Sequence, residues 1–249
     1  MPNLYLVPLD RLDPGATVTL TPDRSNYLCR VMRINKGDLL RCTDGNGSVF
    51  ICELVAPNAK KAQLQLRELL EQYTPPDNTL QVGLSLLKGA AQERSLATCV
   101  ELGATHIWLF SADHSNVNMN AERRQKRLAH FDKVVDAAME QCGRVFRPQL
   151  QLTSLSTLID SHRSMECVVL EAGSPPVPTD LPAQDRLVLI GPEGGFSEQE
   201  LAYFKANKLA FFSTGPVTLR AETMPSVALT LLQTATGWHY TARAKVLSD

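Results

Sequence analysis

Five short apolar runs alternate with helical segments from residue 79 onward, and this alternation constrains the fold most strongly. The runs are Leu80–Leu87, Thr105–Phe110, Cys167–Leu170, Leu187–Ile190 and Leu209–Phe212. Apolar spacing and stop signals predict helices between or after several of them, at Gln92–Leu102, Glu122–Gln141 and Ser226–Thr236. Short buried strands separated by helices are typical of an α/β domain with a mainly parallel sheet.

Residues 1–72 have a different pattern, which predicts a β-rich domain. Leu39–Cys42 and Val49–Val55 carry strand-forming residues, and the sequence Asp-Gly-Asn-Gly between them predicts a hairpin turn. Lys61–Leu70 alternates apolar and polar residues and predicts another strand. The polar, proline-bearing segment 73–78 breaks this pattern. We therefore expect a domain at 1–72, a linker at 73–78 and a second domain at 79–249.

Composition excludes several classes of protein. The net charge of -1 gives no global sign of nucleic-acid binding, so any basic surface must be local. No stretch reaches the roughly 18 apolar residues that a membrane span needs, and the N-terminus lacks a secretory pattern. The 6 cysteines form no C-x-x-C pair, which favours reduced thiols over a metal site. We expect a cytoplasmic protein with no membrane association and no metal.

One apolar run leads directly into a glycine-rich turn. Leu187–Ile190 is followed by Gly-Pro-Glu-Gly-Gly, and then Ser197 and Glu200 have the spacing of a capping box at a helix start. Ligands bind at the carboxyl ends of parallel strands, where glycine lets them approach the backbone. A tight turn that needs glycine for its own conformation would give the same pattern. No Gly-Lys-Ser/Thr follows, and the glycine spacing excludes the dinucleotide fingerprint.

A second polar segment joins another apolar run to a helix. Residues 213–224, with the sequence STGPVTLRAETM, connect Leu209–Phe212 to the helix expected at Ser226–Thr236. Arg220 and Glu222 lie near the entrance of that helix, where the helix dipole favours a carboxylate. A capped helix with a surface arginine would look the same, so this segment alone does not identify a site.

Together the two segments resemble the cofactor-binding loops of the SPOUT superfamily, and within it the RsmE family. The resemblance rests on IGPEGGFSEQE followed by a G-x-x-x-L-R-x-E-T segment, and it extends upstream in order. The upstream marks are Tyr27–Asp38, Lys88-Gly89, Glu101-Leu102-Gly103 and Glu140-Gln-Cys-Gly-Arg144. Members of this family methylate N3 of a uridine in 16S ribosomal RNA, so the resemblance implies that activity here.

The resemblance also implies a fold, a cofactor and partners. It implies an α/β protein whose N-terminal PUA-like β-barrel binds RNA and whose C-terminal domain is a trefoil-knotted methyltransferase, a rare topology. The implied cofactor is S-adenosyl-L-methionine, and the implied partners are 16S rRNA or the small ribosomal subunit and a second copy that completes each pocket. The implied cofactor-binding residues are Leu170, Glu171, Ile190, Gly191, Gly195, Thr214, Gly215, Leu219 and Thr223.

Arg220 and Glu222 are the candidate catalytic residues under this resemblance. Uracil N3 carries a proton that it must lose to become a good nucleophile. A guanidinium such as that of Arg220 would stabilise the negative charge that develops on the uracil carbonyls. A carboxylate such as that of Glu222 would accept the proton. We rank Arg220 above Glu222, and the chemistry requires no metal.

RNA contacts are expected on local basic surfaces. The segment Arg24–Arg41 carries five basic residues against a single acid, which suits phosphate contacts that give affinity but no sequence specificity. An ordinary solvated face would have the same composition. With the family marks, the candidate RNA-binding residues are Arg30, Arg33, Lys88 and Arg144.

The chain departs from the family pattern at several positions. The departures are Asn3 and Asn26 in the first domain, Asp113-His114 where the family has a Glu–Arg pair, and Val217 where it has a second arginine. Losing arginines would weaken the grip on an RNA phosphate or on the target base. Two alternatives therefore stay open: a SPOUT methyltransferase with a different RNA target, and a catalytically reduced RNA-binding factor in ribosome assembly.

Overall fold

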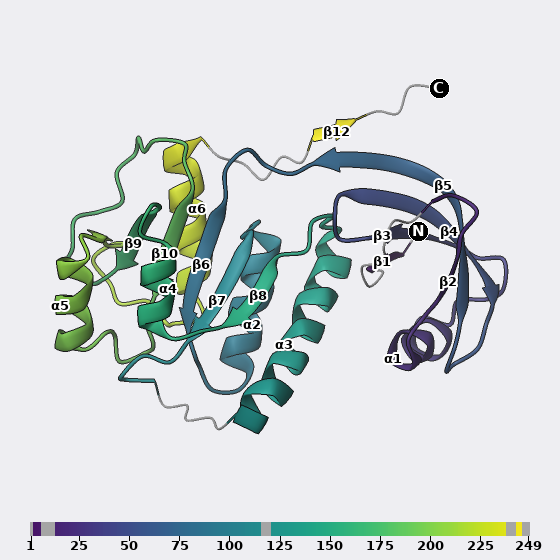
Figure 1. The fold of residues 1–249 in the computed structure, drawn as a ribbon, viewed down its shortest axis with the longest axis horizontal. Helices are drawn as coiled ribbons and strands as arrows, with labels where there is room; N and C mark the ends of the chain where they lie inside the picture. The colour runs from purple at the N-terminus through teal and green to yellow at the C-terminus, as the bar shows by residue number, and fades with distance from the viewer. Residues whose placement is uncertain (1, 6–12, 116–120, 238–242, 246–249) are drawn as a thin grey trace. The chain divides into compact units, whose positions relative to one another are not determined.

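The structure is a computed structural model that describes residues 2–5, 13–115, 121–237 and 243–245 (Figure 1). Its contacts divide the chain into two units. The first unit combines the chain up to residue 75 with the segment 139–147 and the end of the chain, and the second combines 76–138 with 148–241. The first unit is therefore built from separated segments, whereas the sequence suggested a single boundary at 73–78.

The first unit contains a mostly antiparallel six-stranded sheet in the order β1-β3-β4-β5-β12, with β2 also paired to β5. Its strands are β1 (Asn3–Tyr5), β2 (Thr17–Thr19), β3 (Leu39–Thr43), β4 (Ser48–Ala56), β5 (Gln63–Thr74) and β12 (Arg243–Lys245). The predicted β3–β4 hairpin and the strand β5 are confirmed. Strand β5 runs to Thr74 and so includes the first two residues of the predicted linker, because Tyr73 and Thr74 pair with β12.

A helical stretch links β2 to β3 in the first unit. It begins as α1 (Pro22–Asn26) and continues as the π-helix η1 (Tyr27–Val31). Its inner face contributes Leu28 to the core, and Ser25 fixes it to the sheet by accepting a 2.8 Å hydrogen bond from the N–H of Ala62. The sequence carried the family mark here but predicted no helix.

The segment 139–147 joins the first unit through the side chain of Glu140. One carboxylate oxygen accepts hydrogen bonds from the backbone N–H of Tyr5 at 3.0 Å and from Arg24 at 2.5 Å. The backbone of Arg147 adds a 2.8 Å hydrogen bond to the carbonyl of Gly45. These contacts join residues that are far apart in the sequence, so local patterns gave no sign of them.

The second unit contains a six-stranded sheet in which every pair is parallel, in the order β11-β9-β10-β6-β7-β8. Its strands are β6 (Leu80–Ser85), β7 (His106–Phe110), β8 (Gln149–Leu152), β9 (Glu166–Leu170), β10 (Arg186–Ile190) and β11 (Ala210–Phe212). The α/β prediction is confirmed, with all five apolar runs forming strands. Strand β8 was missed because this edge strand alternates exposed and half-buried residues and is short.

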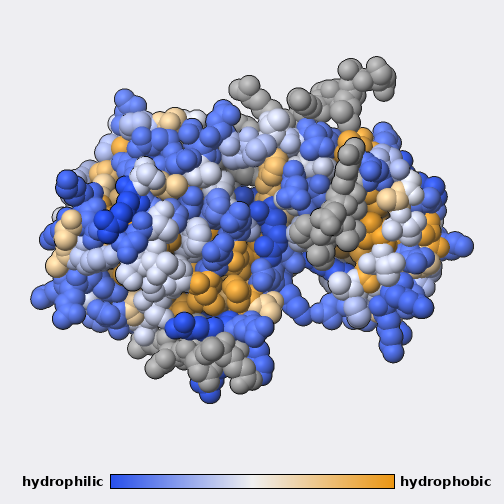
Figure 2. Space-filling view, in the orientation of Figure 1, coloured by the Kyte–Doolittle hydropathy of each residue, from blue (hydrophilic) through white to orange (hydrophobic). Residues whose placement is uncertain are grey.

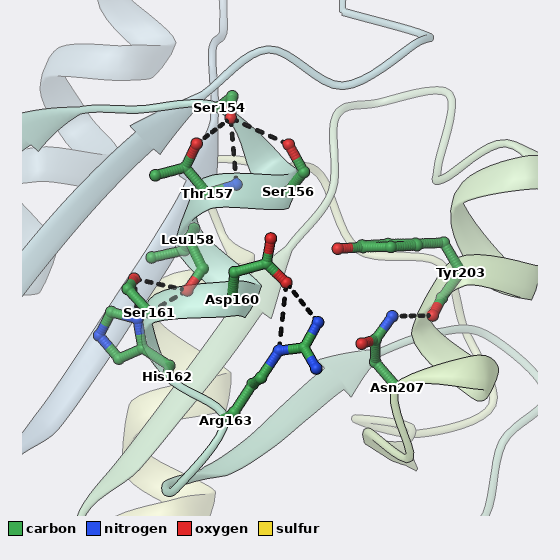
Figure 3. A network of polar contacts seen from close by, with 10 residues as sticks. All are labelled: Ser154, Ser156, Thr157, Leu158, Asp160, Ser161, His162, Arg163, Tyr203 and Asn207. Carbon is green, nitrogen blue, oxygen red and sulfur yellow. Dashed lines mark hydrogen bonds and ion pairs between the residues drawn. The ribbon is translucent and has the colours of Figure 1, made fainter.

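The helices of the second unit cover both faces of its sheet (Figure 1). They are α2 (Ala90–Glu101), α3 (Ala121–Cys142), α4 (Leu155–Ser161), α5 (Glu198–Ala206) and α6 (Met224–Thr236), and α3 ends in the first unit. Helices α4 and α5 pack through Leu158 and Phe204 onto Val169 and Leu189 of the sheet. Only α4 was not predicted. It is seven residues long, and Ser154 caps it by accepting from the N–H of Thr157 (Figure 3).

Most of the surface in the view of Figure 2 is hydrophilic, with smaller hydrophobic areas. Within the described residues, no helix combines the length and the apolar character that crossing a membrane requires.

Candidate functional site

Three loops meet at one edge of the parallel sheet and enclose a pocket. Strands β9, β10 and β11 are neighbours that run in the same direction, so their carboxyl ends, Leu170, Ile190 and Phe212, lie at the same edge. The loops after these strands surround about 670 Å³ of space, counted with its open mouth. This is the place and the size range in which α/β proteins bind small ligands.

The pocket brings together almost all the residues that the sequence proposed for the cofactor. Those that line it are Leu170, Glu171, Ile190, Gly191, Gly195, Thr214, Gly215 and Leu219. Thr223 does not line the pocket, because it is the N-cap of α6 and its N–H donates to the carbonyl of Arg220 at 2.9 Å. Further lining residues, such as Phe196, Val217 and Met224, were missed: all three stand inside the two segments, but the resemblance assigned none of them to the cofactor.

Two pocket glycines leave the backbone open to a ligand. Gly195 has φ +70 and Gly215 has φ +138, values that residues with a side chain rarely adopt. A Cβ atom at either position would meet no other atom within 4 Å, so it would project into open space. The main chain of both loops is therefore accessible from the pocket.

The charges that line the pocket are all negative. They are the carboxylates of Glu171 and Glu193, and none of the described residues that line the pocket is a lysine or an arginine. Burial raises the pKa of Glu171, whose backbone N–H also donates to the carbonyl of Phe212 at 2.9 Å. Such a lining suits a ligand that carries positive charge or hydroxyl groups.

The predicted capping box is confirmed, and it also holds the loop after β7. Ser197 and Glu200 exchange hydrogen bonds at the start of α5. The second carboxylate oxygen of Glu200 accepts from the N–H of Asp113 at 3.0 Å, and the hydroxyl of Ser197 donates to the carboxylate of Asp113 at 2.5 Å. The β7 loop is thereby fixed beside the glycine turn.

His114 makes a further contact with the glycine turn. Its Nδ1 lies 3.1 Å from the carbonyl oxygen of Gly194 and 3.2 Å from that of Gly195. Both neighbours are acceptors, so the hydrogen-bond network assigns the proton to Nδ1. Of the two residues that stand where the family has a Glu–Arg pair, Asp113 thus contacts the start of α5, and His114 contacts the turn that forms one wall of the pocket.

Arg220 and Glu222 lie beside the pocket and do not line it. Arg220 is exposed and stands between two lining residues, Leu219 and Ala221. Glu222 accepts a 3.1 Å hydrogen bond from Arg94. Its own backbone N–H, and then the guanidinium of Arg94, lower the pKa of the Glu222 carboxyl. A carboxylate with a lowered pKa is a weak base, which disfavours Glu222 as a proton acceptor.

The candidate RNA contacts differ in their accessibility. Arg30, Arg33 and Lys88 are exposed. Arg144 is only 6% exposed, and its Nε donates to the carbonyl of Phe146 at 2.6 Å. The structure thus gives Arg144 an internal role, which corrects our expectation of a phosphate contact.

Among the described residues, no cluster of three or more His, Cys, Asp or Glu side chains could hold a metal ion.

Comparisons with known proteins identify the family. The model of an RNA methyltransferase domain matches residues 74–233, and that of an RNA methyltransferase PUA domain matches residues 20–67. The ribosomal RNA small subunit methyltransferase E of Synechocystis is 30% identical over 86% of this chain and 72% of the relative. The chain belongs to the ribosomal RNA small subunit methyltransferase E family. The methyltransferase E of Bacillus subtilis is 25% identical over 92% of this chain and 94% of its own length.

Solved structures agree with membership of the methyltransferase E family. A methyltransferase from Legionella pneumophila, solved with the bound cofactor SAM, has a TM-score of 0.86 at 25% identity and covers 94% of this chain and 97% of its own. The methyltransferase E of Neisseria gonorrhoeae, bound to S-adenosyl methionine, has a TM-score of 0.83 at 26% identity, covering 95% and 98%. The fold is therefore an α/β methyltransferase unit with a PUA unit.

Proposed function

We propose that this chain methylates N3 of a specific uridine in 16S rRNA of the small ribosomal subunit, with S-adenosyl-L-methionine as methyl donor. Family membership supports the reaction and the RNA, and the likeness to two structures that hold the cofactor supports the donor. The observation that supports the proposal is the pocket at the ends of β9, β10 and β11, where the loops that the resemblance assigns to the cofactor enclose one ligand-sized space.

The residues of the pocket fit this cofactor. Open backbone at Gly195 and Gly215 can pair with the edge of an adenine, and Leu170, Ile190 and Leu219 offer apolar walls for its ring. The carboxylates of Glu171 and Glu193 suit a ligand with ribose hydroxyls, a sulfonium and an ammonium group. When bound, the cofactor supplies an electrophilic methyl group.

Arg220 would act on the uracil and not on the cofactor. Arg220 stands between two lining residues, Leu219 and Ala221, and from there its guanidinium would stabilise the negative charge that spreads to the uracil carbonyls as N3 loses its proton. Glu222 is paired with Arg94, so we propose that it helps to position Arg220 and that the proton passes to solvent. On the RNA side the reaction balances, because N3 gains a methyl group and releases one proton.

We further propose that Arg30, Arg33 and Lys88 contact RNA phosphates, that residues 1–72 form a PUA-like β-barrel and that 79–249 form a trefoil-knotted domain. The family resemblance supports these features. It also supports two further proposals, that the protein is a homodimer with shared pockets and that it acts in the cytoplasm.

Val217 favours one alternative, a different RNA target. It lines the pocket at 67% exposure and places an apolar group where the family has an arginine.

Deletion of the gene tests the reaction and its target. We expect 3-methyluridine to disappear from 16S rRNA, as measured by mass spectrometry of nucleosides, and to return with the intact gene. Loss of another methylated nucleoside would support the altered target. A 16S rRNA with an unchanged set of methylated nucleosides would overturn the proposal.

Cofactor binding should depend on His114. We expect His114→Ala to weaken binding of S-adenosylhomocysteine by roughly threefold to tenfold, the effect of losing one hydrogen bond that orders the glycine turn. His114→Asn is the matched control, because its side-chain N–H lies near the position of Nδ1 and should keep affinity within about twofold. Titration calorimetry measures both, and wild-type affinity in His114→Ala would contradict this role.

A further inference from the structure

The π-helix η1 exposes two large hydrophobic side chains on the surface of the first unit. Tyr27 is 39% exposed and Val31 is 64% exposed. They are four residues apart and so lie on the same face of the helix, whereas Leu28 between them is fully buried. Among the described residues, the other exposed large hydrophobic side chains, Leu39, Leu70 and Val217, lie outside this helix. An adjacent exposed pair calls for an explanation that single residues do not.

Three exposed basic residues lie close to this hydrophobic pair in the sequence. Arg30 lies on the same helix, and Arg33 and Lys36 follow it, all of them exposed. The nearest acids in the sequence are Asp23, on the preceding helix α1, and Asp38, which accepts a 2.8 Å hydrogen bond from the backbone N–H of Asn35. A surface that combines an aromatic ring, an aliphatic side chain and several cations suits a ligand with both flat apolar groups and phosphates.

The backbone here has two unusual features. The N–H of Met32 bonds the carbonyl of Tyr27 in a π-helical turn, a form that is frequent at functional sites. Arg33 then has φ 55, and the N–H of Ile34 bonds the carbonyl of Leu28 to close the helix. Glycine is the usual residue at such a C-terminal position because other residues are strained there. An arginine at this point supplies a charge that glycine would not.

We propose that Tyr27, Arg30, Val31 and Arg33 bind an unpaired nucleotide of the RNA substrate. The base stacks on the Tyr27 ring and packs against Val31, and the flanking phosphates pair with Arg30 and Arg33. Unpaired bases expose the flat faces that aromatic side chains bind, whereas a duplex hides them and is recognised through shape and backbone. The surface therefore distinguishes single-stranded from double-stranded RNA. This inference rests on the proposed action on rRNA.

The test measures binding of the full-length protein to two probes, an unstructured eight-nucleotide RNA and a blunt duplex of the same length. We expect Tyr27→Ala to weaken binding of the single strand about tenfold and to leave duplex binding within about twofold. Tyr27→Phe should retain affinity because the stacking ring remains. Leu70→Ala is the matched control, since Leu70 is also 39% exposed in the same unit but lies on β5, and it should change neither affinity.

Arg33→Gly separates a binding role from a structural one. The variant removes a phosphate contact, so binding of both probes should weaken, and the slope of log affinity against log salt concentration should become shallower by about one. Because glycine also relieves the strained backbone at this position, the melting temperature should not fall. Val31→Ser serves as a second variant at the hydrophobic surface and should reduce single-strand binding selectively.

Two results would overturn the inference: equal losses for single strand and duplex in Tyr27→Ala, or no loss for either. The second result would point to a protein partner for this surface. If the wild-type protein methylates 16S rRNA and binds the single strand while Tyr27→Ala and Val31→Ser behave as wild type, only this inference fails. If the wild-type protein neither methylates rRNA nor binds RNA, the proposed function fails with it.

Discussion

Replacing Arg220 with alanine is expected to lower kcat at least a hundredfold and to leave the affinity for S-adenosylhomocysteine within about twofold. The two effects separate because Arg220 stands beside the pocket without lining it. A preformed cation near the site of developing charge contributes to the transition state and little to cofactor binding. Multiple-turnover methylation of saturating small ribosomal subunits measures the first effect, and titration calorimetry measures the second.

Two companion variants sharpen this expectation. Arg220→Lys keeps the charge but loses the planar fork, so we expect an intermediate kcat. Glu222→Gln removes a carboxylate that Arg94 already holds, so we expect only a severalfold loss and an unchanged shape of the pH profile. If Glu222→Gln were as inactive as Arg220→Ala and lost the acidic limb of the profile, Glu222 would be the proton acceptor. Full activity in Arg220→Ala would remove Arg220 from the mechanism.

The sequence could predict the pocket because its walls are local motifs attached to predictable strands. Strand β10 is fully buried, its residues Leu187–Ile190 form a continuous apolar run, and the glycine turn follows it directly. Parallel neighbours place their carboxyl ends together, so the family's loops had to meet. Thr223 was the exception, because it caps helix α6 and does not line the pocket. A shift of one position along the chain separates these two roles, and motif spacing does not resolve so small a difference.

Long-range contacts were beyond prediction from the sequence. Glu140 and Arg144 belong to one family mark, yet Glu140 bonds Tyr5 and Arg24 far back in the chain, and Arg144 is buried against its own loop. Arg144 belongs to a family mark, and its charge suggested a phosphate contact. The sequence shows the charge of this residue but not that its side chain is buried. The edge strand β8 was hidden for a related reason, since exposed positions interrupt its apolar pattern.

A buried ion pair lies at the start of β10, at the end away from the glycine turn, and its loss is expected to have the largest effect on stability. Arg186 begins this strand with its side chain 2% exposed, and its Nε donates to Glu166 on β9 at 2.6 Å. Glu166 also accepts from Gln184 at 2.9 Å. We expect Glu166→Ala to destabilise the second unit by about 3 kcal/mol, or roughly 6–12 °C in melting temperature. The guanidinium cannot lose its proton and would stay buried without a counter-charge.

The matched control is an ion pair with similar hydrogen bonds at an exposed position. Asp160 accepts two hydrogen bonds from Arg163, at 3.2 and 2.7 Å, where both side chains are exposed (Figure 3). Water can solvate either group alone, so Asp160→Ala should leave the melting temperature unchanged. The double variant Glu166→Leu with Arg186→Met should recover much of the loss, because it removes both charges together. An unchanged melting temperature in Glu166→Ala would mean that Arg186 finds water or another acceptor. In that case the pair would not hold β10, the strand that carries the glycine turn, in register with β9.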